Sequence, residues 1–423
     1  MKPSDVVITG MGLYTSLGYT VPDVWNRVLD NQSGIKLISH QDWLSGHGVH
    51  LLASCKDSFD FSNFFRSWNI NKKNLRNMGR ISSMFCHSVL SALEDAGFDS
   101  HQSLPRRSSG MIVGTGVSLC DEHQPTPPAS RNPKWFLDTY PNIVLAQSSV
   151  ATGITGYGNT IVNACTSASL AIGQAYNMIR SGEATVMVAG GADSRLSPSF
   201  LSGFSQLNMH SKSDDAIRAM RPFDKLRSGF VLGEGAGALV LEKREHAIQR
   251  GAKILASVAG FSSSMDAYRM TDPCPKGKAK AMRGALADAN LQPHQIDYIN
   301  AHGTSTLSND KEESKAINDV FQGHCPLVNS SKAMLGHTLA ASGAIESIMC
   351  VQSLISQTLH ANPNLDHLDP SCDINLVGKS PMSHRLRYCM NNSSGIGGSN
   401  TTLIFERNSI PEINTEHANT FQI

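Results

Sequence analysis

The stretch that decides the fold is Thr160-Ile-Val-Asn-Ala-Cys-Thr-Ser-Ala-Ser-Leu-Ala-Ile-Gly-Gln-Ala-Tyr-Asn-Met-Ile-Arg-Ser-Gly-Glu183. Its start, Thr160–Asn163, is typical of a strand. The segment Ser167–Arg180 predicts a helix, because serine and threonine suit a helix start and Gly182 suits its C-terminal cap. Apolar residues lie on most sides of this helix, so we expect it to be buried.

Cys165 lies at the turn between this strand and this helix. The amides of a helix N-terminus point at such a position, and the helix macrodipole favours an anion there. Both effects predict a thiol pKa below the free value of about 8.5, and therefore a reactive thiolate. The stretch alone is equally compatible with a buried, inert cysteine.

Composition bounds the class of protein. A chain of 423 residues is too long for one simple core, so we expect two packed halves. The 36 basic and 35 acidic residues give no sign of bulk nucleic-acid binding. Nine cysteines without a Cys-x-x-Cys pair indicate reduced thiols. We see no apolar run typical of a signal peptide or a membrane span, and we expect neither segment. We therefore predict a cytoplasmic protein with neither a nucleic-acid nor a membrane partner.

The second half of the chain repeats the order of motifs in the first. Each half has a helix end before a strand, a Gly-Thr turn, a Val-Asn pair before a long apolar helix, and a glycine-rich motif that runs into a strand. The helix end Ala92–Phe98 is repeated at Ala285–Leu291. The pair Val162-Asn163 is repeated at Val328-Asn329. This order indicates an internally duplicated α/β unit, joined near residue 250.

The duplication predicts three regions: residues 1–250 with Cys165, residues 251–410, and a flexible tail at 411–423. Strands that alternate with helices predict two mixed sheets, covered on both faces and sharing central helices. Equivalent loops of duplicated units meet at their pseudo-twofold axis. The turn that carries Cys165 should therefore face the turn that carries His337.

Two histidines stand apart from the other fourteen. His302 follows a strand in Asn300-Ala-His-Gly-Thr-Ser-Thr306, and His337 ends Ser331-Lys-Ala-Met-Leu-Gly-His337 before a helix. Glycine and threonine beside them let the backbone approach a ligand. Imidazoles can donate hydrogen bonds to a developing enolate or oxyanion and can relay protons. A lone histidine is more often a surface or packing residue.

In combination, these motifs resemble those of the β-ketoacyl-[acyl carrier protein] synthases, the type II synthases above all, within the thiolase superfamily. The Cys165-Thr-Ser turn is closer to synthase II than to synthase I, whose turn typically reads Cys-Ala-Thr. The pair of histidines differs from the His and Asn of synthase III and chalcone-type enzymes. The motif Gly395-Ile-Gly-Gly398 lacks the second cysteine of biosynthetic thiolases. The resemblance runs from Val6 to Glu406 and implies a thiolase-like α-β-α-β-α arrangement.

The resemblance implies a decarboxylative Claisen condensation. Cys165 would take an acyl chain from acyl carrier protein as a thioester. Malonyl-acyl carrier protein would then lose carbon dioxide with the help of His302 and His337, and the carbanion would attack the acyl thioester. The product is a β-ketoacyl chain two carbons longer, as in fatty acid elongation. The backbone amides of Cys165 and Ile396 resemble the family's oxyanion hole. No metal and no cofactor are implied, except that the substrates carry phosphopantetheine.

Further site residues are implied by the same resemblance. They fall into three groups: pantetheine contacts, chain-length residues, and a buried ionic network around Lys332. The pantetheine contacts are Thr304 and Thr306, and the chain-length residues are Val117 and Phe204. The network joins Lys332 to Glu346, with Asp310 or Glu313 as further members. Lys332 counts among the catalytic residues in this scheme, although a purely structural ion pair is an equal alternative.

The glycine-rich motif departs from the family pattern Asn-Ser-Phe-Gly-Phe-Gly-Gly. This chain reads Asn392-Ser-Ser-Gly-Ile-Gly-Gly398, so both phenylalanines are missing. Ile396 is smaller than the gating phenylalanine and has fewer rotamers. We therefore expect weaker discrimination between short and long acyl primers. One basic cluster has two equal interpretations, a docking site for the carrier protein or a solvated helix face: Lys72, Lys73, Arg76 and Arg80.

Two alternatives remain open from the sequence. The chain could be a ketosynthase of a polyketide or another specialised pathway. It could also be a silent partner resembling the chain-length factors, although these usually lack the cysteine that is present here. In either catalytic case the resemblance implies a homodimer in which strand Ile161–Asn163 pairs with its own copy, which would cover an exposed sheet edge.

Overall fold

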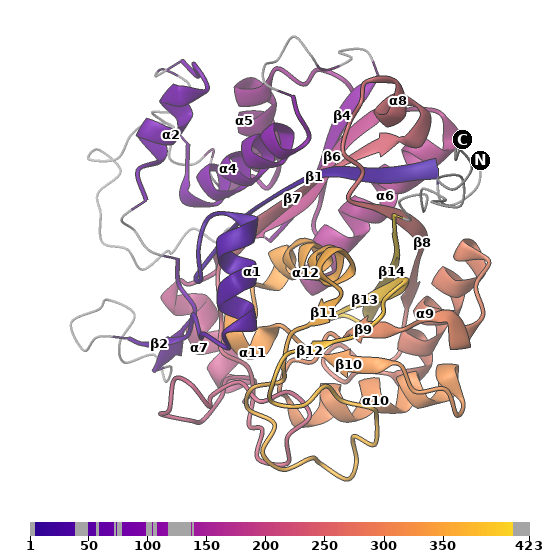
Figure 1. Ribbon diagram of the computed structural model, residues 1–423. Helices are drawn as coiled ribbons and strands as arrows, with labels where there is room; N and C mark the ends of the chain where they lie inside the picture. The colour runs from indigo at the N-terminus through magenta and orange to yellow at the C-terminus, as the bar shows by residue number, and fades with distance from the viewer. Residues whose placement is uncertain are drawn as a thin grey trace, which may run out of the picture.

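The structure is a computed structural model (Figure 1) that describes residues 5–38, 50–55, 59–71, 73, 78–98, 104, 108–116, 137 and 139–408. Val117, Lys72, Arg76 and the predicted tail at 411–423 lie outside these residues.

A ten-stranded mixed sheet forms the frame of the molecule, and its strand order repeats. The first five strands run in the order β1-β7-β6-β4-β5, and the second five in the order β8-β14-β13-β9-β10. In both runs the first three strands pair antiparallel and the last three pair parallel. The strands are β1 Val6–Thr15, β4 Ser109–Thr115, β5 Gly158–Ile161, β6 Val186–Asp193, β7 Gly235–Lys243, β8 Ala256–Met265, β9 Tyr298–Asn300, β10 Leu327–Asn329, β13 Tyr388–Gly395 and β14 Ser399–Arg407.

The two five-stranded runs are continuous, whereas the sequence predicted two separate sheets. They join where β1 meets β8, through the pairs Val7↔Ser257 and Ile8↔Ala256. This seam is only two residue pairs long. The sequence repeat describes each run by itself and does not predict how the two runs join. The predicted boundary near residue 250 stays a prediction.

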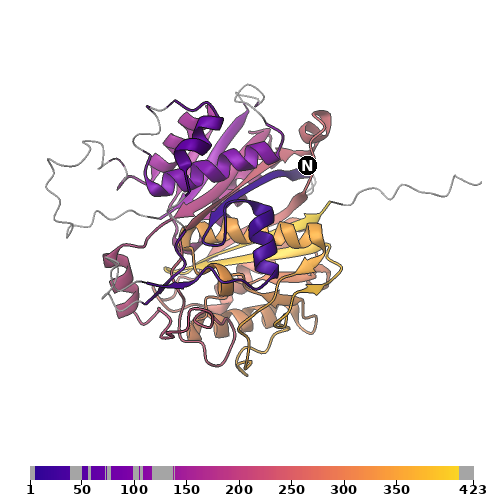
Figure 2. The ribbon, with the colours of Figure 1, turned by 60° about the vertical axis from the view of Figure 1, so that its left-hand side comes forward.

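Helices cover the sheet in three layers. Helices α4 and α5 pack on the outer side of the first run, and α9 and α10 lie on the outer side of the second. Between the runs, α6 packs against α12, as the magenta and orange helices of Figure 1 show. Figure 2 shows the orange helix between the purple strands of the first run and the yellow strands of the second. The predicted α-β-α-β-α arrangement is confirmed. The helices are α1 Val21–Leu29, α2 Phe61–Ser67, α4 Arg80–Asp95, α5 Asn142–Thr152, α6 Ser167–Ser181, α7 Pro198–Gln206, α8 Arg244–Gln249, α9 Pro275–Ala289, α10 Leu307–Phe321, α11 Lys332–Leu335 and α12 Ser342–Ser356.

Strand β1 is longer than its glycines suggested. Gly10 reads in the sequence as the end of a short strand that begins at Val6, but β1 continues through Gly12 to Thr15. A Cβ added at Gly10 would lie 2.0 Å from the carbonyl oxygen of Ala92, and one at Gly12 would lie 2.1 Å from that of Ser88. Both oxygens belong to α4. The glycines therefore let α4 pack directly on β1 and do not mark a strand end.

One segment meets the length and hydropathy of a membrane span, contrary to the sequence-based expectation. It is Leu339–Ser356, an 18-residue stretch that contains α12. Its residues are 83% buried inside the protein, in the layer shared by the two runs of strands. The apolar character of this helix is accounted for by the core in which it lies.

Candidate active site

Cys165 is held in a sharp turn between β5 and the buried helix α6. A 3-10 turn, Ala164–Thr166, connects the two, and Ala164 has a left-handed φ of 49°. The amide of Asn163 donates to Ser167 Oγ at 2.8 Å, and its side-chain nitrogen donates to Ser399 Oγ at 2.7 Å. The turn is therefore fixed from both halves of the chain. Leu339, at the equivalent turn before α12, has a similar φ of 48°.

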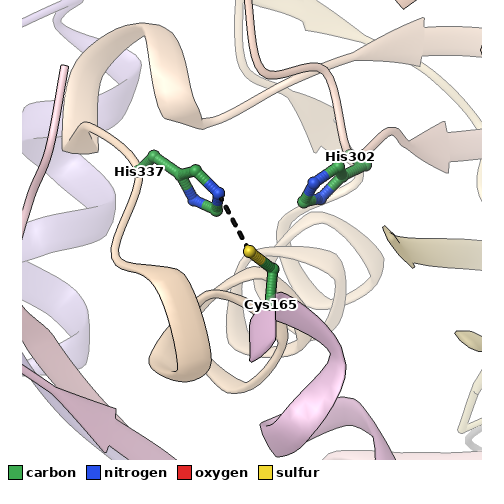
Figure 3. A group of neighbouring side chains, drawn as sticks. All are labelled: Cys165, His302 and His337. Atoms are coloured by element: carbon green, nitrogen blue, oxygen red, sulfur yellow. Dashed lines mark hydrogen bonds between the residues drawn. The ribbon is translucent and has the colours of Figure 1, made fainter. Parts of the chain in front are cut away.

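Cys165, His302 and His337 converge, as Figure 3 shows. The Cys165 sulfur lies 3.3 Å from His337 Nε2, and the two imidazole centroids lie 5.4 Å apart. One ligand atom from each of the three side chains lies within 4.8 Å of the others. The expectation that the Cys165 turn faces the His337 turn is confirmed. Thiolate sulfur and imidazole nitrogen are also zinc ligands, so a metal-free site stays a prediction.

The surroundings of His337 favour a neutral ring that can accept a proton. Burial, then the positive charges of Lys332 and Arg195, hold the pKa of His337 well below its usual value. Its Nδ1 lies 3.1 Å from Ser342 Oγ. With the ring proton on Nδ1 and donated to this hydroxyl, Nε2 presents a lone pair to the Cys165 thiol.

The thiol itself is not pre-ionised, which corrects the prediction of a lowered pKa. Burial raises the pKa of Cys165 to about 11, although the charges of Arg195 and Lys332 act to lower it. The sequence placed the cysteine at a helix N-terminus but could not show how deeply the turn is buried. Cys165 therefore rests as a thiol, and His337 Nε2, 3.3 Å from the sulfur, is placed to accept its proton.

We expect alkylation of resting Cys165 by iodoacetamide to rise with pH. Only the thiolate reacts, so with a pKa near 11 the rate should grow about tenfold per pH unit between neutrality and pH 10. Mass spectrometry of the Cys165 peptide measures this rate, and a Cys165→Ala variant reports the labelling of other cysteines. A rate that is already constant below pH 8 would contradict the raised pKa.

His302 is fixed through its backbone, and its side chain lines the cavity. Glu313 accepts hydrogen bonds from the amides of His302 and Gly303, at 2.8 and 2.9 Å. The Nδ1 atom of His302 is buried and has no hydrogen-bond partner among the described residues. Burial, then the charges of Lys332 and neighbouring groups, keeps the pKa of His302 well below its usual value. A neutral imidazole on the cavity wall can bind a substrate oxygen through its ring N–H.

Lys332 contacts the backbone behind the histidines. Its Nζ donates to the carbonyl oxygen of His302 at 2.6 Å and forms a buried ion pair with Glu346. Burial raises the pKa of Glu346 to about 7 against the opposing charge of Lys332. Lys332 is not among the described residues that line the cavity. These contacts favour a positioning role over direct chemistry.

The two acids that the sequence offered as alternative partners of Lys332 have other contacts. Asp310 accepts a hydrogen bond from the amide of Phe223 at 2.9 Å and lies 3.6 Å from Arg227 Nε. Burial raises the pKa of Asp310 to about 6, although the charge of Arg227 acts to lower it. Glu313, as described above, holds the amides at His302. Of the three acids, Glu346 is the one in direct contact with Lys332.

A cavity of about 350 Å³ opens in front of Cys165. Its wall contains most of the substrate residues that the sequence singled out: Phe204, Thr304, Thr306 and Ile396, beside Cys165, His302 and His337. The hydroxyls of Thr304 and Thr306 lie 2.9 Å apart. A Cβ added at Gly395 would lie 3.4 Å from the Cys165 amide nitrogen. The glycine-rich loop with Ile396 therefore lies directly beside Cys165.

The comparisons with known proteins agree with this architecture. Residues 3–247 match the family model for the N-terminal domain of β-ketoacyl synthases, and residues 255–366 match the model for the C-terminal domain. The chain belongs to the β-ketoacyl synthase family.

Individual β-ketoacyl synthases match almost the whole chain. It is 36% identical to 3-oxoacyl-[acyl-carrier-protein] synthase 2 of Vibrio harveyi over 420 residues, which are 96% of this chain and 99% of the relative. A β-ketoacyl synthase structure from Burkholderia phymatum STM815 superposes with a TM-score of 0.89 at 32% identity, covering 97% of this chain and 100% of that one. A type II polyketide ketosynthase in complex with its acyl-carrier protein (AntDE:AntF) gives 0.85 at 27% identity, with 96% and 100% coverage.

Two basic residues of this β-ketoacyl synthase have contacts that the sequence did not predict. The guanidinium of Arg80 binds Glu234 at 2.6 Å and the carbonyl oxygen of Cys55 at 3.1 Å, and its role in docking the carrier protein stays a prediction. Lys278 was missed entirely and lines the cavity. The signal in the sequence was a lysine in the first turn of a helix, where a cation opposes the helix dipole.

Proposed function

We propose that this β-ketoacyl synthase condenses an acyl thioester with malonyl-acyl carrier protein to give a β-ketoacyl chain two carbons longer, as in fatty acid elongation. The observation that carries the proposal is the 3.3 Å contact between Cys165 Sγ and His337 Nε2, with the unpartnered Nδ1 of His302 at the same buried site. A thiol beside a neutral base is suited to covalent acyl transfer.

In the first half-reaction Cys165 receives the acyl chain. Its proton passes to His337 Nε2, the sulfur attacks the acyl carbonyl, and the carrier protein's thiolate leaves and takes that proton back from His337. The carbonyl oxygen gains negative charge in the tetrahedral intermediate. The amides of Cys165 and Ile396 are the donors that we assign to this oxygen, since the glycine-rich loop lies beside the Cys165 amide.

In the second half-reaction the malonyl thioester supplies a carbanion without a strong base. The bond between the carboxylate carbon and the α-carbon breaks, carbon dioxide leaves, and the electron pair moves into an enolate. We assign the stabilisation of the enolate oxygen to His302 and His337. For this step His337 carries its ring proton on Nε2, and the Ser342 hydroxyl donates to Nδ1. The α-carbon then attacks the acyl thioester, and the Cys165 sulfur is the leaving group.

Partner and compartment follow from the same proposal. The substrates arrive on acyl carrier protein, and Thr304 and Thr306 on the cavity wall offer hydroxyls to its pantetheine arm. The similarity to a ketosynthase described in complex with its carrier protein supports this partner. We place the enzyme in the cytoplasm and assign it no cofactor beyond the phosphopantetheine of its substrates.

A polyketide ketosynthase is the second candidate. Ile396 and Ser394 replace the expected aromatic gate, and the chain is also similar to a type II polyketide ketosynthase. Product analysis with purified carrier protein, malonyl donor and a ladder of acyl primers distinguishes the two. Single elongation of saturated primers of several lengths supports fatty acid synthesis. Rejection of these primers in favour of β-keto chains supports the second candidate, and no elongation of either rejects both.

We further predict a homodimer built on the β5 edge. β5 is the last strand of the sheet, and three apolar side chains around it are exposed. Val150 of α5 is 59% exposed, Tyr157 is 49% exposed and Val162 is 45% exposed. A second copy that pairs with β5 would cover both the edge and these side chains.

The substitution Val162→Asp tests this interface. Two copies of the new carboxylate would face each other near the twofold axis, and we expect the dimer dissociation constant to rise about 30-fold or more. Sedimentation measures the change. Ile248→Asp, at an exposed position on α8, is the control and should leave the dimer intact. A wild type that is monomeric at all concentrations would contradict the prediction.

A further inference from the structure

Lys278 is a buried cation in an unfavourable place. It lies in the first turn of α9 and is only 5% exposed. A positive charge there opposes the helix dipole, and burial of an ammonium group costs free energy unless partners offset it. Burial accordingly lowers the pKa of Lys278, while the charges of Glu313, Asp266 and Asp310 act to raise it. Packing of α9 alone gives no reason for a lysine at this position.

The contacts of Lys278 leave part of its ammonium group available. Its Nζ donates to Asn309 Oδ1 at 3.0 Å and to Ser394 Oγ at 2.6 Å. Both acceptors are neutral, and no carboxylate in the described part of the chain forms an ion pair with Nζ. An ammonium group has three donors, so one has no acceptor among the described residues. Asn309 and Ser394 themselves line the cavity, which places Nζ at the cavity wall.

Ser394 explains why the lysine fits here. The serine stands where the family motif has a phenylalanine, and it links Lys278 to the glycine-rich loop. Ser394 Oγ donates to Asn400 Oδ1 at 2.9 Å, and Asn400 Nδ2 donates to Asp266 Oδ1 at 2.7 Å. A polar chain therefore replaces aromatic packing behind Ile396. Serine in place of phenylalanine at position 394 therefore leaves space and a hydrogen-bond acceptor for the Lys278 ammonium group.

The charge of the cavity is the decisive observation. Among the described residues that line it, Lys278 is the one lysine or arginine, and Asp266 and Asp272 are the acids. His302 and His337 are neutral there, as shown above. A carboxylate that enters this cavity must lose its hydration, and Lys278 is the cation that can offset the loss.

We propose that Lys278 binds the free carboxylate of the malonyl thioester. This inference rests on the proposed function, since malonyl-acyl carrier protein is the substrate that brings an anion to the inner cavity. The acyl primer is neutral, and the phosphate of the pantetheine arm lies at its far end, on the carrier protein.

This contact stabilises the transition state no more than the ground state. As carbon dioxide forms, the negative charge leaves the carboxylate and moves to the enolate oxygen, away from Lys278 and towards the histidines. Lys278 keeps its proton throughout. Interactions of this kind lower KM without raising kcat, so the lysine determines which extender thioester binds and does not speed the loss of carbon dioxide.

The test compares Lys278→Met with wild type, with malonyl-acyl carrier protein as the varied substrate and carbon dioxide release as the signal. Methionine keeps the length and removes the charge. We expect KM for the malonyl substrate to rise about 10- to 100-fold, the range for a hydrogen bond to a charged group, with kcat unchanged or higher. Acyl transfer to Cys165 should be unaffected. Lys278→Arg should lie between the two, and Lys280→Met, at an exposed position on the same helix, should behave as wild type.

Other results overturn the assignment. An unchanged KM in Lys278→Met, or a parallel fall of acyl transfer and malonyl turnover, would show a structural role only. If that variant does not fold, Lys278→Arg decides: KM must rise while acyl transfer stays normal, and unchanged KM rejects the proposal. Wild type that releases no carbon dioxide from malonyl-acyl carrier protein would instead reject the proposed function. The two failures are therefore distinguishable.

Discussion

Replacement of Cys165 by alanine is expected to abolish condensation and leave the fold intact. The sulfur is the only atom lost, and the turn that holds it is fixed by hydrogen bonds of Asn163 and Ser167, which remain. Without a covalent acyl intermediate the reaction has no first half. Product formation should therefore fall below detection, while circular dichroism and the thermal unfolding midpoint stay close to those of wild type.

The control for this loss is Cys325→Ala. Cys325 is exposed, in contrast to the buried Cys165, and should be dispensable. A Cys165→Ala variant that still elongates an acyl primer would show that the nucleophile is another group. A variant that unfolds would instead show that the turn depends on the thiol.

The two histidine substitutions should have large but different effects. His302→Ala removes a donor to the enolate, and we expect decarboxylation to fall about 10²- to 10³-fold with little change in acyl transfer. His337→Ala should impair both half-reactions, because His337 Nε2 lies 3.3 Å from a thiol whose pKa is raised to about 11. On sequence grounds alone both histidines were expected to affect decarboxylation and condensation more than acyl transfer, since Cys165 was expected to be ionised at the helix N-terminus.

Single-turnover measurements separate the half-reactions. Acyl transfer is followed as the mass gain of the enzyme, and decarboxylation as carbon dioxide release by enzyme that is already acylated. His360→Ala is the control, since His360 is fully buried but is not among the described residues of the cavity wall. Equal losses of both half-reactions in His302→Ala would contradict this division of roles.

The local motifs were predictable from the sequence, whereas their electrostatics were not. The turn at Cys165, the helix after it and the pairing with His337 followed from short motifs and from the repeat. Two local interpretations failed for non-local reasons. The glycines of β1 allow α4 to approach and do not end the strand, and burial by both halves of the chain raises the Cys165 pKa against the helix N-terminus.

Lys278 shows the same limit. Its partners Asn309 and Ser394 are 31 and 116 positions away in the chain, so no motif connects them. The missing phenylalanine at position 394 was visible in the sequence, but the contact of Ser394 with Lys278 was not. Lys332 is a similar case: the sequence offered three acidic partners, and the fold brings Glu346 into contact with it.

The most direct test of the account follows one acyl group through both half-reactions. Wild-type enzyme is incubated with acyl-carrier protein, its intact mass and its Cys165 peptide are measured, and malonyl-acyl carrier protein is then added. We predict an acyl group on Cys165 that disappears on this addition, with one carbon dioxide released per β-ketoacyl product two carbons longer on the carrier protein. An acyl group on another residue, or an acyl-Cys165 that the malonyl substrate does not elongate, would contradict the account.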